Sequence, residues 1–255
     1  MKKLIINKIL IIFIIVTIFS IPVIAFARPG GGSGGSSGGS GGSGGGSAHS
    51  STRGNGNGRT NPIASIINFG VFMVIGSTGA IVYRVKVSKK KKECVTTIKS
   101  LADKDDNWDY ENIKNDIQEV FDKVGIAWIE MDQELARGYV SEKLFENHRM
   151  KLEWMKIRKE RNIIEGLTLL KITVLGLEDR DGIDRDVLWA SIKATSIDYT
   201  INEETKQIIK GDSSRPIGYE EYWRFIKTPE RWVLDEIKQV EEIENLEFFK
   251  ISIDN

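Results

Sequence analysis

The sequence predicts an α+β domain in which helices come first and an antiparallel run of strands follows. Between residues 113 and 135, apolar residues recur every three or four positions, the spacing of a helix with one buried face. From Leu167 onward, segments rich in β-branched and aromatic residues alternate with turn-like sequences. We therefore expect N-terminal helices packed on one face of a curved antiparallel sheet, preceded by a single transmembrane helix.

The predicted elements can be placed along the chain. The apolar stripe of the first helix consists of Ile113, Ile117, Val120, Phe121, Val124, Trp128, Met131 and Leu135. Ser141 can cap a second helix, and the apolar face of that helix consists of Leu144, Phe145, His148, Leu152 and Met155. The predicted strands are Leu167–Glu178, Val187–Ile201, Tyr219–Lys227 and Trp232–Val240. The tail Asn245–Asn255 is compatible with a helix or with a short strand.

Two apolar segments precede this domain. The first follows Lys2 and Lys3 and ends in Ala25-Phe26-Ala27, so residues 1–27 read as a secretory signal peptide. Residues 28–61 are mostly Gly, Ser, Asn and Arg and predict a disordered linker. The second apolar segment, Ile63–Tyr83, has no charged residue, and about 21 residues at ~1.5 Å each match a ~30 Å bilayer core. Residues 62–87 are therefore predicted to form a transmembrane helix.

A cluster of basic residues follows the predicted span, and residues 88–94 are predicted to act as a juxtamembrane stop-transfer segment. Such clusters stay on the cytoplasmic side, so the domain at 95–255 is expected to face the cytoplasm of a single-pass cell-membrane protein. Whether the signal peptide is cleaved stays open, and a second, retained span would return the chain to the same side. Gly76 and Ala80 form one small-xxx-small pair, a weak signal for a homodimer through the span. The membrane-proximal basic residues are Arg84, Lys86, Lys89, Lys90, Lys91 and Lys92.

The net charge of zero conceals an asymmetry. Residues 95–255 contain 24 basic and 35 acidic residues, a net charge of −11, whereas the preceding residues are strongly basic. An acidic domain repels phosphates, so we expect no nucleic-acid partner. Each lysine near an anionic leaflet contributes about 1 kcal/mol, which makes membrane lipids an expected partner of the basic cluster.

Aromatic side chains of the strands form the candidate binding face. In a strand, alternate residues face opposite sides, so Tyr222 and Arg224 point away from Trp223 and Phe225. One set is expected to fill the core and the other to line a face for a peptide or an acyl chain, and the sequence leaves open which is which. The candidate binding residues are Trp189, Tyr199, Tyr222, Trp223 and Arg224.

Enzymatic chemistry has few candidate residues. A pocket carboxylate or histidine would be needed, and Asp132 and His148 are the candidates because both lie near the helical apolar stripes. The chain has two histidines and one cysteine, which excludes a multi-histidine metal site and an intramolecular disulfide. The acidic run Asp179–Asp186 lacks the EF-hand spacing, and no phosphate loop or nucleophile elbow occurs. We expect no metal, no cofactor and no enzymatic activity; the alternative is a small-ligand-binding or enzymatic domain of the same fold.

Two segments resemble the bacterial members of the Tim44-like family, named after a scaffold subunit of the mitochondrial import motor. They are Ala127–Asp132 with Leu135 and Tyr139, and Tyr222–Ile226 followed by Arg231–Ile237. The resemblance implies a cone-shaped fold of the cystatin-like or nuclear-transport-factor-two-like type. It also implies a non-enzymatic domain that contacts lipids or a protein partner, unidentified here, at the membrane. The predicted membrane span takes the place of the long N-terminal helical segment through which the mitochondrial scaffold recruits its chaperone.

Overall fold

The structure of this protein is a computed structural model that describes residues 62–181 and 186–254, with side chains from residue 81 onward. The predicted signal peptide (1–27), the predicted linker (28–61) and the side chains of Gly76 and Ala80 lie outside the described part. Among residues 81–181 and 186–254, whose side chains the structure describes, no helix has a stretch both long and apolar enough to cross a membrane.

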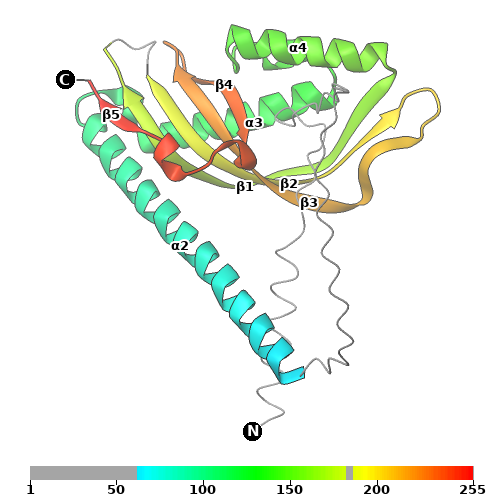
Figure 1. The fold of residues 1–255 in the computed structure, drawn as a ribbon. Helices are drawn as coiled ribbons and strands as arrows, with labels where there is room; N and C mark the ends of the chain where they lie inside the picture. Colours follow the sequence, from blue (N-terminus) through cyan, green and yellow to red (C-terminus); the bar gives the residue numbers. More distant parts are fainter. Residues whose placement is uncertain (1–61, 182–185, 255) are drawn as a thin grey trace, which may run out of the picture.

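Three helices pack on a curved five-stranded sheet that forms a half-barrel (Figure 1). The helices are α2 (Pro62–Ala102), α3 (Tyr110–Ile129) and α4 (Glu142–Ile157). The strands are β1 (Glu160–Asp179), β2 (Val187–Asn202), β3 (Ile208–Lys227), β4 (Trp232–Gln239) and β5 (Ile251–Ile253). Short 3-10 helices lie at η1 (Asp106–Trp108), η2 (Gln133–Ala136), η4 (Val240–Glu242) and η5 (Leu246–Phe248). The predicted α+β class is confirmed.

The sheet has the order β4-β3-β2-β1-β5, and its first four strands are antiparallel neighbours. The last strand, β5, runs parallel to β1 through the pair Leu177 and Ile251. The sheet is therefore mixed, and the prediction of a purely antiparallel sheet is wrong at this edge. The tail Asn245–Asn255, which the sequence left open between helix and strand, contains a short piece of each: the 3-10 helix η5 and the three-residue strand β5.

Both predicted helices of the domain are present, but the first one is shorter than its apolar stripe. The Asp109 carboxylate accepts a 2.7 Å hydrogen bond from the Asn112 amide and caps α3, whose inward stripe is buried. The helix ends at Ile129 because Met131 has a φ of 54°, outside the helical range. Leu135, the last residue of the predicted stripe, lies in the separate 3-10 helix η2 and is 44% exposed, so the expected continuation of the helix to this residue is wrong.

The strands extend further than their apolar segments. β1 begins at Glu160 instead of Leu167, and β3 begins at Ile208 instead of Tyr219, because polar residues at the far end of the sheet also pair. Three register shifts between β1 and β2 curve the sheet. Helix α3 lies against this curve so closely that a Cβ atom on Gly125 would come within 2.5 Å of the Leu167 side chain.

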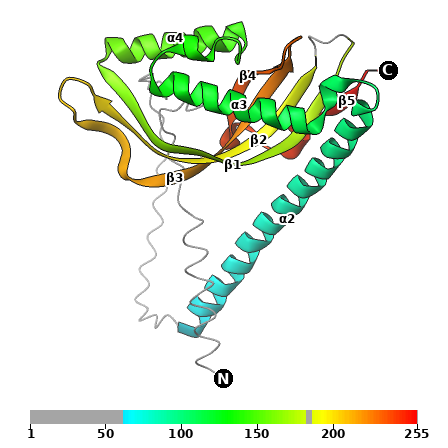
Figure 2. The same ribbon diagram turned by 180° about the vertical axis from the view of Figure 1, so that it is seen from behind.

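The curved sheet divides the apolar residues into two groups. Helices α3 and α4 cover the concave face, and α2 approaches the sheet from the convex side and ends beside β5 (Figures 1 and 2). The main core lies between α3 and the concave face and includes Ile117, Trp223 and Phe225. The second group, on the convex face, includes Trp189, Tyr222 and Phe249, with Val87 of α2 packed against it.

Candidate functional site

The basic residues that follow the predicted span lie on α2. This helix runs from Pro62 to Ala102 without a break, so the residues predicted as span, stop-transfer segment and start of the domain share one helix. Its last turns enter the main core, where Cys94 and Ile98 are completely buried. Burial raises the pKa of the Cys94 thiol to about 12, which leaves it protonated and unreactive at neutral pH.

The basic residues divide between two sides of the helix. Arg84, Lys86, Lys89 and Lys92 are exposed, whereas Lys90 and Lys91 are half-buried. Lys90 lies 3.9 Å from the carboxylate of Glu93. We call the six residues Arg84, Lys86 and Lys89–Lys92 the basic collar.

A hydrogen bond joins α2 to the convex face of the sheet just before the basic collar. The hydroxyl groups of Tyr83 and Tyr222 lie 2.7 Å apart, and Val87 packs one turn further along the helix. Burial is the main cause that raises the pKa of Tyr222, and the bond to Tyr83 adds to it. The start of the collar is thereby held against β3.

The candidate binding residues lie on both faces of the sheet. Trp189 and Tyr222 belong to the convex aromatic group, where Phe249 contacts both rings at centroid distances of 5.8 and 4.8 Å. Trp223 lies in the main core, 5.7 Å from the Phe121 ring. The opposite orientation of Tyr222 and Trp223 agrees with the predicted alternation.

The other two candidate binding residues are tied to acidic neighbours. Arg224 on β3 forms an ion pair with Asp235 on β4. Tyr199, near the far end of β2, donates a 3.2 Å hydrogen bond to Glu165 on β1. The five candidate binding residues therefore do not form one continuous surface.

The two candidate pocket residues line different hollows. Asp132 is exposed, and its carboxylate accepts a 3.0 Å hydrogen bond from the Glu134 amide at the start of η2. It lines a hollow of about 160 Å³. His148 is only 1% exposed, and its ring packs edge-on against Trp128 at 5.5 Å.

His148 lies at a larger groove between α4 and the edge strand β4, with a volume of about 460 Å³. We call it the α4–β4 groove. Exposed Met150 and Trp154 lie along its rim, at 50% and 60% exposure. Its other lining residues include Lys143, Lys151, Asp235 and Ile237.

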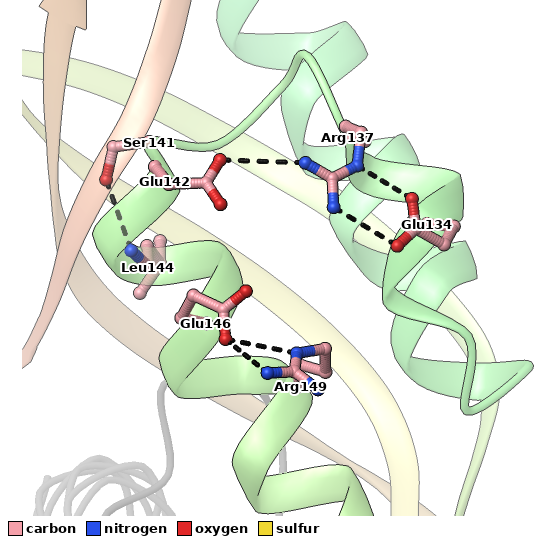
Figure 3. Close-up of polar contacts among 7 residues, drawn as sticks. All are labelled: Glu134, Arg137, Ser141, Glu142, Leu144, Glu146 and Arg149. Atoms are coloured by element: carbon pink, nitrogen blue, oxygen red, sulfur yellow. Dashed lines mark hydrogen bonds and ion pairs between the residues drawn. The ribbon is translucent and has the colours of Figure 1, made fainter.

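Polar contacts hold the first turn of α4 beside β4 and η2 (Figure 3). Ser141 caps the helix by accepting a 3.2 Å hydrogen bond from the Leu144 amide, and its own amide donates to the Leu234 carbonyl. Arg137 bonds to Glu134 at 2.7 Å and lies 3.6 Å from Glu142. The bond from Arg137 lowers the pKa of Glu134. The groove therefore has a fixed end where α4 leaves the sheet edge.

Sequence reasoning missed a buried carboxylate on the concave face. Glu221 is 2% exposed and accepts hydrogen bonds from the indole of Trp223 at 3.0 Å and from Gln239 at 3.1 Å. Burial lowers the pKa of Lys151 on α4, and the Glu221 charge opposes that shift. The alternation of residues along β3 could have revealed it, because Glu221 lies on the same face of the strand as Trp223 and Phe225. The cavity beside Glu221 measures about 20 Å³, room for about one water molecule.

A second buried polar group lies below α4. The Trp128 indole donates a 2.9 Å hydrogen bond to Asn162, whose amide donates a 2.7 Å bond to Asp198. Asn162 and Asp198 are 1% and 2% exposed. This chain of bonds joins α3 to β1 and β2, which is a structural role.

Three carboxylates converge near the start of β2. One oxygen each of Asp105, Asp179 and Asp186 lies within 4.8 Å of the others. Burial is the main cause that raises the pKa of Asp186 to about 6, and the two neighbouring carboxylates add to the shift. A backbone hydrogen bond from Arg180 opposes it. Asp179 also accepts a 3.0 Å bond from the Trp108 indole, so this cluster supports the local packing.

Comparison with curated proteins finds no match. Among solved structures, the intermembrane-space region of the chloroplast protein ARC6 is similar at 13% identity, with a TM-score of 0.34. The match covers 50% of this chain and 91% of that one. RPA3114, a SEC-C motif containing protein from Rhodopseudomonas palustris, is similar at 15% identity over 45% of this chain and 71% of that one, with a TM-score of 0.23. At these scores, neither likeness carries an argument about this chain.

The family comparison covers more of the chain. The Tim44-like domain matches residues 95–239, more than half of the sequence. The match begins inside α2, continues through α3, α4 and the four long strands, and ends with the last residue of β4. It includes both segments that carried the resemblance in the sequence. The chain therefore belongs to the Tim44-like domain family.

Proposed function

We propose that this protein is a single-span membrane protein that presents a non-enzymatic Tim44-like binding domain at the cytoplasmic face of the cell membrane. The observation that carries the proposal is the continuity of α2. The helix has 41 residues, about 60 Å at 1.5 Å per residue, and the bilayer core accounts for about 30 Å of it. The remaining half carries the basic collar and the buried residues Cys94 and Ile98.

The contact between Tyr83 and Tyr222 supports the membrane-proximal part of the proposal. Tyr83 is the last residue of the uncharged segment, and tyrosine is enriched at the membrane–water interface. If Tyr83 lies at the membrane–water interface, its 2.7 Å bond to Tyr222 holds the convex face of the sheet next to the membrane surface. Both figures show the N-terminal half of α2 extending from the convex side of the sheet (Figures 1 and 2). Lipids are therefore the proposed neighbours of the collar and of that side.

The surroundings of the candidate acid and base residues support a binding role over an enzymatic one. Catalytic use of Glu221 would need space for a substrate, and its adjoining cavity has room for about one water. Trp223 and Gln239 already bond to its two oxygens. Asp132 and His148 line different hollows, so they do not form an acid–base pair in one pocket.

The topology can be tested with reporters fused after Asn255. A phosphatase that folds only outside the cytoplasm should be inactive there, and a fluorescent protein that folds in the cytoplasm should be bright. Changing Lys89–Lys92 to glutamine should increase phosphatase activity. The matched control removes four exposed lysines from elsewhere in the domain, namely Lys156, Lys171, Lys210 and Lys250. High phosphatase activity in the unmodified chain would refute the proposed location.

A further inference from the structure

The outer edge of β4 is only partly covered by the chain itself. β4 is the terminal strand of the sheet, and the segment before α4 pairs with its first half. Leu234 donates to the Tyr139 carbonyl at 2.9 Å and accepts from the Ser141 amide at 2.7 Å, in a parallel bridge centred on Val140. The chain then turns into α4 and leaves the edge.

The next residues of β4 keep an uncovered edge. Beyond β3, no residue of the described chain forms a backbone hydrogen bond with Asp235–Lys238. In an antiparallel pair, alternate residues direct their N–H and C=O groups away from the partner strand. The edge therefore offers backbone donors and acceptors at the point where the α4–β4 groove opens. An added strand would continue the parallel pairing that Tyr139–Ser141 begins.

The two walls of the groove have matching lengths. On β4, the five steps from Leu234 to Gln239 extend about 17 Å at ~3.3 Å per residue. On α4, the eleven steps from Lys143 to Trp154 also extend about 17 Å at 1.5 Å per residue. A segment of about six extended residues fills this length.

The charges of the groove favour an acidic occupant. The acids on β4 already have partners, because Asp235 pairs with Arg224 and Glu236 lies 2.9 Å from Lys238. On the α4 wall, Lys143 forms no ion pair with any residue that the structure describes. Lys151 lies further along the same wall, followed by the exposed apolar ring of Trp154. From the N-terminal to the C-terminal end of α4, the side chains that line the groove are therefore first positively charged and then apolar.

We propose that the α4–β4 groove binds an extended acidic-then-apolar peptide segment of a partner protein, which adds to β4 as a parallel edge strand. Backbone bonds to β4 provide affinity, and the α4 side chains select the sequence. This inference deepens the proposed function by naming the binding site and the chemistry of the partner. It rests on that function only in treating the domain as a binding module and does not depend on the membrane location.

The test uses the full chain in lipid nanodiscs and a fluorescein-labelled peptide, Glu-Thr-Glu-Thr-Leu-Thr, read by fluorescence polarisation. The glutamates and the leucine lie on one face of the extended peptide, and threonine favours the strand conformation. Saturable binding is expected, and the same peptide with lysine in place of glutamate should bind at least about tenfold more weakly. Absence of binding up to millimolar peptide would overturn the proposal.

Backbone methylation distinguishes strand addition from a looser contact. Two versions of the peptide carry N-methyl groups on either the odd or the even residues. In an added strand, only every second residue directs its N–H group toward β4, so methylation of that set should abolish binding and methylation of the other set should leave it intact. Equal binding of both versions, or equal loss, would overturn the edge-strand geometry.

Protein variants locate the site. Trp154→Ala should weaken peptide binding about tenfold, because an exposed aromatic ring in a groove acts as an anchor. Leu170→Ala is the matched control, since Leu170 is similarly exposed at 62% but lies on β1. Equal affinities of the two variants would place the peptide elsewhere. Self-association of the chain that Trp154→Asp abolishes would instead identify a second copy as the occupant. Reporter topology remains a separate readout, so either proposal can fail alone.

Discussion

Replacing Ile98 by alanine tests whether the helix that carries the basic collar is a structural part of the domain. Ile98 lies on α2 beyond the collar, is completely buried and belongs to the same core cluster as Trp108 and Ile113. Removing a fully buried isoleucine side chain costs about 2–5 kcal/mol, from lost burial and from the cavity left behind. For a domain of this size, each 1 kcal/mol lowers the melting temperature by about 2–4 °C. A loss of about 3 kcal/mol therefore predicts a fall of about 6–12 °C.

The assay is thermal unfolding of the full chain in mild detergent, followed by near-ultraviolet circular dichroism of the tryptophans. Ile126→Ala is the matched control, since it makes the same chemical change on α3 at a residue that is 48% exposed. The control should unfold within about 2 °C of the unmodified protein. If the melting temperature of Ile98→Ala equals that of the control, α2 does not contribute to the core. The argument that joins collar and domain would then fail.

Two further predictions concern the convex face and the acidic cluster. A double-mutant cycle of Tyr83→Phe and Tyr222→Phe, measured by urea unfolding, should give a coupling free energy of about 0.5–1.5 kcal/mol, and zero coupling would contradict the 2.7 Å bond. Because the folded state raises the pKa of Asp186 to about 6, the folded chain holds the extra proton between about pH 4 and 6, and the unfolding free energy falls as pH rises through this window. Asp186→Asn removes this buried charge and should stabilise the chain by about 1 kcal/mol at pH 7.5, a value that allows for solvent screening around exposed Asp105. At pH 4 the folded state already holds Asp186 protonated, so the substitution should have no effect on stability there. Equal gains in melting temperature at both pH values would contradict this reasoning.

The helices and most of the strands could be predicted because their periodicity reports which face is buried. The second stripe is an example, since Leu144, Phe145, His148, Leu152 and Met155 are all buried on α4. The strand β5 could not be predicted in the same way. It has three residues, and its parallel partner Leu177 lies more than seventy residues earlier in the chain. No local pattern encodes such a contact.

The candidate site was predictable only in part. The alternation of β3 correctly places Tyr222 and Trp223 on opposite faces, but it cannot say which face another segment covers. Phe248 and Phe249, from the tail, cover Trp189 at centroid distances of 5.2 and 5.8 Å. The α4–β4 groove also depends on how two distant elements pack. Its edge was beyond sequence reasoning because no residue pattern marks where α4 leaves β4.

The packing of the tail has a practical consequence for isolating the Tim44-like domain. The family match ends at Gln239, but the chain continues into η4, η5 and β5, and Phe249 is completely buried against Trp189 and Tyr222. A fragment cut at the family boundary would remove this cover and expose part of the two rings, whose full surfaces are about 150–250 Å² each. Water-exposed apolar patches of that size promote aggregation. The unit that folds stably therefore extends beyond the residues matched by the family, and the final residues of the chain cover apolar side chains that water would otherwise reach.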